Sequence, residues 1–179
     1  MIIAHLPPQP MPLGVILSVV VAASTDLTAR RVPNLLIACG LVASLAAQIW
    51  LSGPFAGFVQ WIEGALTGFA LLFPVYLLGG TAAGDVKLLM LVGAWIGPDA
   101  TLYVALMTFL FGGCWGLALA LVRGRFVSMW KSVAYLLNTL MHGEHTPGKP
   151  EHIPGGSVGT IPYAVPIAAG TLVVLCNSI

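Results

Sequence analysis

Residues 101–122 read TLYVALMTFLFGGCWGLALALV and carry no charged side chain. A helix needs about 20 mainly apolar residues to cross the hydrocarbon core of a membrane, and this stretch is long enough. Comparable apolar stretches follow one another along the rest of the chain, at about 11–27, 34–52, 60–79, 86–98 and 158–178. The sequence therefore predicts an all-α, polytopic integral membrane protein with about six transmembrane helices.

The composition of the whole chain agrees with a protein embedded in a membrane. Of the 179 residues, 58% are hydrophobic and 7% are charged, whereas about 25% of the residues of a soluble domain are charged. This composition excludes a soluble domain of this size, and the high hydrophobicity excludes a disordered chain. The net charge of +1 says nothing about nucleic acid, but the chain has no basic stripe, so we expect no nucleic-acid partner. From the length we expect a single membrane-embedded domain, residues 1–179.

Two segments are expected to lie outside the spans. Residues 126–141 place apolar side chains at helical spacing but are interrupted by polar ones, which predicts an amphipathic helix lying at the membrane interface. Residues 142–157 are polar and predict an aqueous loop on the cytoplasmic side. His142, His145 and His152 lie in that loop, but their spacing matches no strong zinc pattern, so we expect neither a metal nor another cofactor.

The basic residues predict how the chain is oriented. With six spans, all seven Lys and Arg residues fall on one side of the membrane. The positive-inside rule makes that side cytoplasmic and places both termini outside. Asp26 closes the first span and Asp85 opens the fourth, where the helix is expected to begin near Ala82. Both acids are therefore expected near the cytoplasmic boundary.

Asp26 and Asp85 form the candidate catalytic pair. Acids at a membrane edge are costly, so they are functional candidates by default. An aspartic protease uses two carboxyl groups that share one proton: the ionised group takes a proton from water, and the neutral group polarises the scissile carbonyl. The alternative is structural. Asp26 would then cap its helix or pair with Arg30, and Asp85 would cap its helix or pair with Lys87.

Glycines surround the second acid. Gly79, Gly80 and Gly84 leave backbone accessible, and an extended peptide substrate pairs with exposed backbone. The alternative is that these glycines permit close helix packing, as we expect for the Gly64-x-x-x-Gly68 pattern.

Each of the polar residues near the two acids has two interpretations. Lys87 either contacts a carboxylate or anchors its helix at the interface, and we favour the anchor. Arg30 either contacts the substrate or sets the topology through lipid headgroups, and we favour the topology role. Asn34 either hydrogen-bonds Asp26 or caps the second helix, and we favour the cap.

Prolines interrupt the last span. Pro162 and Pro166 are expected to kink this helix and to free backbone carbonyl groups. The kink either shapes a groove beside the two acids, with Tyr163 lining it, or has a structural role alone.

Three segments resemble one protein family. Residues 24–34, STDLTARRVPN, resemble the first aspartate motif of the type IV prepilin leader peptidases, in which an Asp is followed by basic residues and then by Ile/Val-Pro-Asn. Residues 82–88, AAGDVKL, resemble the second motif, Gly-x-Gly-Asp-x-Lys-Leu. Residues 159–170, GTIPYAVPIAAG, resemble the C-terminal Pro-Tyr segment of the family. The resemblance covers most of the chain in order and spacing.

The resemblance implies an aspartic membrane endopeptidase of the GxGD type with Asp26 and Asp85 as its catalytic residues. Such enzymes remove the short basic leader from type IV prepilins and pseudopilins at the cytoplasmic face of a bacterial or archaeal inner membrane. The implied partners are these precursors and the membrane lipid. The substrate-binding or supporting residues on the matching positions are Gly84, Lys87, Arg30, Asn34, Pro162 and Tyr163.

Two departures from the family pattern bear on function. Ala82 stands where the second motif has its first Gly. No CxxC motif occurs, whereas the long members of the family carry an N-terminal cytoplasmic domain with paired CxxC motifs and methylate the new N-terminus. The chain thus resembles the short, peptidase-only branch of Flp-type (tight-adherence) pilus systems, and methylation is not implied.

Two other functions fit part of the pattern. A small proton-coupled carrier also has interrupted helices and acids in the membrane, but here both acids lie near one face and the halves show no clear repeat. A non-catalytic membrane subunit of a pilus or secretion machine would have the two acids by coincidence.

Overall fold

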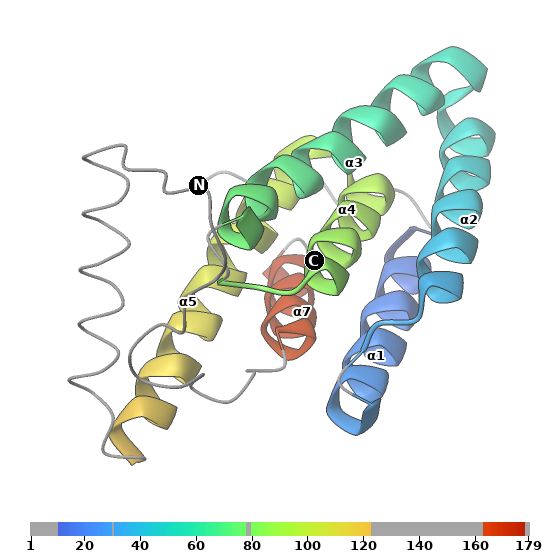
Figure 1. Cartoon of the computed structure of the whole chain (residues 1–179). Helices are drawn as coiled ribbons and strands as arrows, with labels where there is room; N and C mark the ends of the chain where they lie inside the picture. Colours follow the sequence, from blue (N-terminus) through green and yellow to red (C-terminus); the bar gives the residue numbers. More distant parts are fainter. Residues whose placement is uncertain (1–10, 30, 78–79, 123–162, 178–179) are drawn as a thin grey trace. The chain divides into compact units, whose positions relative to one another are not determined.

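The structure, a computed structural model of the chain, describes residues 11–29, 31–77, 80–122 and 163–177. Within these ranges the chain forms helices joined by short links, and no strand occurs in them. The helices are α1 (Met11–Ala29), α2 (Asn34–Ser52), α3 (Pro54–Leu77), α4 (Ala83–Ile96), α5 (Pro98–Val122) and α7 (Ala164–Asn177). The predicted all-α class is confirmed (Figure 1).

The chain divides into two compact units. The first comprises Met1–Gly112 and Pro162–Ile179, and the second comprises Gly113–Ile161. The described part of the second unit is the end of α5, residues 113–122. Both predicted site acids, Asp26 and Asp85, belong to the first unit.

Glycine and proline set two of the helix boundaries. Gly53 and Gly97 follow α2 and α4 with φ values of 84° and 82°, a region that glycine adopts without strain. The N–H of Gly53 donates to the carbonyl of Ile49 at 3.0 Å, which satisfies one of the last carbonyls of α2. In both links a proline then begins the next helix at its first position, where the missing N–H costs nothing. The predicted spans 34–52 and 86–98 end close to these links, but α3 and α5 begin earlier than the predicted residues 60 and 101.

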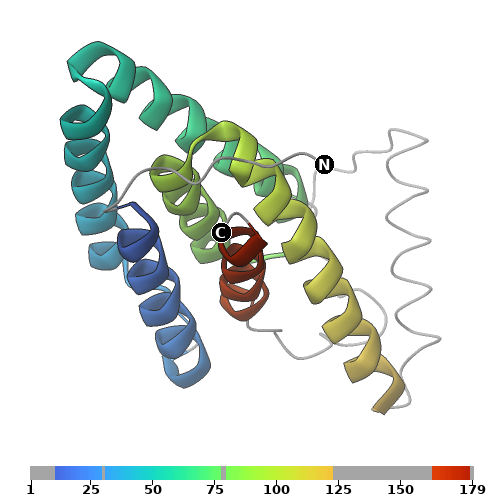
Figure 2. The same ribbon diagram turned by 180° about the vertical axis from the view of Figure 1, so that it is seen from behind.

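Helix α4 occupies the centre of the first unit. It contacts α1, α2, α3 and α7, and Figures 1 and 2 show it enclosed by those helices from both sides. Nearly every residue from Asp85 to Ile96 is buried, and Lys87 is the exposed one. Because α4 is apolar on all sides, its burial in the bundle is what an all-round apolar helix requires.

Glycines let α3 and α4 approach each other closely. A Cβ placed on Gly64 would overlap the backbone carbonyl of Gly93, and a Cβ on Gly93 would overlap the carbonyl of Gly64. One turn further along α3, a Cβ on Gly68 would overlap the carbonyl of Leu89. The close packing that the Gly64-x-x-x-Gly68 pattern predicts is confirmed, and its partner is α4.

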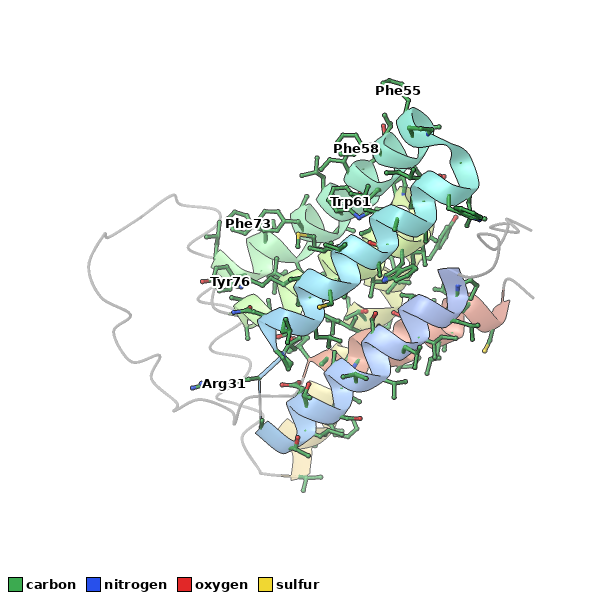
Figure 3. The ribbon with its side chains drawn as sticks, turned by 90° about the vertical axis from the view of Figure 1, so that its right-hand side faces the viewer. Arg31, Phe55, Phe58, Trp61, Phe73 and Tyr76 are labelled. Atoms are coloured by element: carbon green, nitrogen blue, oxygen red, sulfur yellow. The ribbon has the colours of Figure 1, made fainter. Side chains whose placement is uncertain are left out.

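The outer surface of the helices is apolar. Four helices, α1, α2, α3 and α5, are long and apolar enough to cross a membrane. Aromatic side chains follow the outer side of α3, where Phe55 is 84% exposed and Phe73 stacks on Phe69 with ring centroids 4.8 Å apart (Figure 3). A chain with so much exposed apolar surface is stable in lipid, and the protein is a polytopic membrane protein.

The other two helices are shorter than expected. α4 and α7 each contain 14 residues, fewer than the roughly 17 that a perpendicular span requires. α4 begins directly after Ala82, close to the start that the sequence predicts. The predicted interfacial helix at 126–141 and the loop at 142–157 lie outside the described residues.

The expected proline kink in the last helix is wrong for Pro166. Because α7 begins at Ala164, Pro166 lies in its first turn, where no backbone N–H is needed and a proline ring meets no preceding turn. Pro162 lies outside the described residues.

Candidate active site

Asp26 lies in the last turn of α1, with a relative exposure of 9%. Its Oδ2 accepts a hydrogen bond from the backbone N–H of Ala164 at 3.3 Å. Ala164 is the first residue of α7, so this N–H has no partner inside its own helix. The start of α7 thus satisfies one oxygen of Asp26 and adds the favourable end of a helix dipole.

Asp85 lies in the first turn of α4, with a relative exposure of 5%. Its Oδ2 accepts two hydrogen bonds, from the hydroxyl of Thr81 at 2.9 Å and from the backbone N–H of Ala82 at 3.1 Å. Ala82 is the N-cap of α4 and has an extended backbone, with φ −90° and ψ 154°. The bond to the N-cap N–H is one half of a capping box.

The two acids come together at one end of the first unit. The end of α1 meets the start of α4, and the carboxyl groups of Asp26 and Asp85 are close enough to interact electrostatically. Tyr163, directly before α7, lies near Asp85. Within the described part of the chain, the recorded hydrogen bonds of both acids go to Oδ2. Each carboxyl group therefore has one oxygen held by the scaffold.

Such a pair can carry general acid–base chemistry. Two carboxyl groups in a low-dielectric site cannot easily both be ionised, so one tends to hold a proton while the other is free to accept one. No group of three potential metal ligands (His, Cys, Asp or Glu) gathers within the residues that the structure covers. His142, His145 and His152 lie outside those residues.

Some of the capping and pairing contacts expected from the structural alternative for the two acids are observed. Asp85 does cap its own helix through the N–H of Ala82, so capping and proximity to Asp26 occur together. Lys87 does not pair with Asp85: its Nζ donates to Oδ1 of Asn34 at 3.0 Å. Arg30, the proposed partner of Asp26, lies outside the described residues.

The prediction that Asn34 caps the second helix is wrong. The N-cap of α2 is Pro33, which has no side-chain acceptor, and Asn34 is the first residue of the helix. Its amide oxygen accepts the bond from Lys87 and thereby links the starts of α2 and α4, two segments 53 residues apart in sequence. Both side chains are exposed, as an interfacial anchor requires.

The two small residues of the second motif fit without strain. Ala82 has a negative φ that any L-residue adopts, so the methyl group in place of the expected Gly is tolerated there. A Cβ on Gly84 would lie 3.5 Å from the Cβ of Val32, an ordinary van der Waals distance. Packing therefore does not demand a glycine at 84.

Sequence reasoning missed two donors of the site. The hydroxyl of Thr81 and the N–H of Ala164 both bind a catalytic candidate. The sequence gives a weak indication of the role of Thr81, because this hydroxyl residue directly precedes Ala82, an N-cap residue that has no polar side chain of its own. The N–H of Ala164 carries none, since its role depends on where α7 begins.

The fold and the site define a class: an all-helical membrane protein with a buried pair of acids at one end of its bundle. The family whose sequence model matches the chain is the type IV leader peptidase family, over residues 13–117. This match covers more than half of the chain and includes both acids. The chain belongs to this family.

Two relatives come from Burkholderia pseudomallei, strains 1026b and K96243, and each is a prepilin leader peptidase/N-methyltransferase. Each is 30% identical to this chain over 119 residues, which is 63% of this chain and 38% of the relative. The chain thus spans well under half of the length of the relatives that it matches. No solved structure matches the chain.

Proposed function

We propose that this protein is a membrane aspartic endopeptidase that removes the basic leader from type IV prepilins or pseudopilins, with Flp-type precursors as its substrates. The observation that carries the proposal is the nearness of Asp26 and Asp85, two buried acids that lie 59 positions apart in sequence and both fall within the family match. Family membership supports the reaction class, and the two relatives have the peptidase activity in their names.

The proposed reaction needs a water and no metal. One carboxylate of the pair takes a proton from the water, whose oxygen attacks the scissile carbonyl carbon while the protonated partner donates a hydrogen bond to the carbonyl oxygen. The tetrahedral intermediate then collapses, the C–N bond breaks, and the leaving amine receives a proton from the pair. The two bonds to Oδ2 of Asp85 support a fixed orientation of its carboxyl group during these steps, and the bond from Ala164 holds one oxygen of Asp26.

The proposed topology places the site at the cytoplasmic face of the inner membrane of a bacterium or archaeon. Its support is the distribution of Lys and Arg, which lie on one side if six segments cross. Both termini would then be outside, and residues 1–179 would act as a single membrane-embedded domain. Gly84 and Tyr163 are proposed to lie beside the bound substrate, whereas Lys87 and Asn34 are proposed to support the site by joining the starts of α4 and α2. Arg30 and Pro162 are also proposed as supporting residues.

A cleavage assay tests the function. The protein is co-expressed with a Flp-type pilin precursor, and the shift to mature length is followed for the parent and for Asp26→Asn and Asp85→Asn. We expect cleavage by the parent and a loss of roughly 10³-fold or more in each variant, because each removes one partner of the acid–base pair.

Asp99→Asn is the matched control. Asp99 is exposed in the first turn of α5 and is expected on the opposite side of the membrane from the pair, so this variant should cleave like the parent. Cleavage that persists in Asp26→Asn or Asp85→Asn would remove that residue from the mechanism. A parent that accumulates in the membrane and cleaves no precursor would favour the carrier or the non-catalytic subunit.

A further inference from the structure

Thr81 differs from the other hydroxyl residues that the structure describes. The hydrogen bonds that the other described Ser and Thr hydroxyls donate run to backbone carbonyl oxygens three or four residues earlier in their own helices, and Ser44 also accepts one from Trp61. These residues are Ser18, Ser24, Thr25, Thr28, Ser44, Thr67, Thr101, Thr108 and Thr171. The Thr81 hydroxyl donates instead to a side chain, at 2.9 Å from Oδ2 of Asp85.

The local backbone explains why this bond can form. A capping box has a polar side chain at the N-cap and an acid three residues later, and each bonds the backbone N–H near the other. Here the N-cap is Ala82, which offers no polar side chain, and the acid is Asp85. Thr81, one residue before the N-cap, brings a hydroxyl to the acid from outside the helix.

We propose that Thr81 is a positioning residue for Asp85, whose hydroxyl fixes the rotation of the carboxyl group so that Oδ1 is the atom presented to the reaction. The proposal rests on the proposed peptidase function. One hydrogen bond to Oδ2 leaves a carboxyl group free to swing about that contact. Two bonds from separate donors, Thr81 and the N–H of Ala82, fix its plane as well.

The same geometry decides where Asp85 carries a proton. Oδ2 already accepts two hydrogen bonds, and a proton on it would have to turn the Thr81 hydroxyl from donor to acceptor. A proton on Oδ1 keeps both bonds as they are, so this is where we place the proton when Asp85 is protonated. From there it can be shared with Asp26 or donated to a substrate carbonyl, as the proposed reaction requires.

Two substitutions separate the hydroxyl from the shape of the side chain. Thr81→Val keeps the branched shape and removes the donor, whereas Thr81→Ser keeps the donor and removes a methyl group. Thr67→Val is the matched control, because among the described residues the Thr67 hydroxyl bonds only the carbonyl of Glu63 in its own helix. All three variants are compared with the parent for accumulation in the membrane and for thermal unfolding.

The first readout is the kinetics of precursor cleavage in proteoliposomes. We expect kcat to fall about 10- to 100-fold in Thr81→Val, the effect of a lost hydrogen bond to an ionisable group, with KM close to that of the parent. Thr81→Ser should restore kcat to within a few-fold of the parent, and Thr67→Val should leave it unchanged. A parental kcat in Thr81→Val, or a change confined to KM, would overturn the proposal.

The second readout needs no substrate. The infrared carboxyl-stretching band of Asp85 is isolated by subtraction: the spectrum of the parent or of each Thr81 variant, minus the spectrum of the same protein carrying Asp85→Asn. The band should shift in Thr81→Val and return in Thr81→Ser. An unshifted band would overturn the role of Thr81 whether or not cleavage is seen. A shifted band with no cleavage by the parent would contradict the proposed function alone.

Discussion

Gly93 and Gly84 both lie on α4, but their surroundings differ. A Cβ on Gly93 would overlap the backbone carbonyl of Gly64 across the α3–α4 contact, whereas a Cβ on Gly84 would meet Val32 at 3.5 Å, an ordinary contact distance. The fold therefore demands a glycine at 93 and does not demand one at 84. A requirement for glycine at 84 would have to come from what binds beside Asp85.

The largest effect is expected from Gly93→Ala. The added methyl group would collide with a backbone atom, which cannot rotate away, so α3 and α4 would have to separate along their closest contact. We expect the folded protein to be lost from the membrane fraction or to unfold at a much lower temperature. Gly113→Ala is the control, because a Cβ on Gly113 meets no described atom within 4 Å. A Gly93→Ala protein as stable as this control would show that the two helices do not pack as described.

Gly84→Ala tests the position on α4 where packing does not require a glycine. Its thermal unfolding should match the parent, with a change in the free energy of unfolding within about 0.5 kcal/mol. Cleavage should nevertheless fall by about tenfold or more, because a methyl group beside Asp85 obstructs the approach of an extended peptide to the backbone. Thermal unfolding and cleavage are measured on the same preparation, so that a loss of activity is distinguished from a loss of folding. Unchanged cleavage would mean that the substrate does not approach the backbone at this position.

The sequence was sufficient to predict the helical class and, to within two residues, where each described helix ends, but α3 begins at Pro54 and not near residue 60. It also singled out the two acids that make up the candidate site. Helix ends at Gly53 and Gly97 were predictable because glycine followed by proline interrupts a helix locally. The approach of Asp26 to Asp85 was expected because two antiparallel spans place the end of one beside the start of the other. These features depend on local chemistry and on the alternation of the spans.

Side-chain partners were harder to predict, because they depend on the register between helices. The sequence suggested Asp85 or lipid as the partner of Lys87, and the observed partner is Asn34, from a helix distant in sequence. Gln48 was overlooked: it is buried, and its amide nitrogen lies 3.4 and 3.3 Å from the carbonyls of Ala94 and Trp95. Nothing in an apolar helical pattern tells which face of α2 meets α4.

A moderate effect is expected from Tyr163→Phe. The tyrosine ring packs near α5, where a Cβ on Gly112 would lie 3.3 Å from Cε1, and phenylalanine keeps that ring. The hydroxyl is lost from a residue that lies near Asp85. We expect kcat/KM to fall about 3- to 10-fold, because the hydroxyl is expected to contribute one neutral hydrogen bond at the site during cleavage, with unchanged thermal unfolding. Tyr103→Phe removes a hydroxyl elsewhere and should cleave normally. Equal activities of the two variants would exclude a role for the Tyr163 hydroxyl.

The smallest effect is expected at the bond between Lys87 and Asn34, which is exposed and joins α2 to α4. In a double-mutant cycle with Lys87→Met and Asn34→Ala, the coupling free energy of unfolding should be below about 1 kcal/mol, as for exposed polar pairs. Each single variant should retain most of its cleavage activity, because neither side chain hydrogen-bonds an acid of the pair within the described residues. If Lys87→Met instead abolishes cleavage while Asn34→Ala does not, the ammonium group acts on the substrate. The exposed side of the start of α4, beside Asp85, is then a binding surface as well. A coupling of several kcal/mol would instead make this bond, like the contact of Gly93 with Gly64, part of what holds α4 in place.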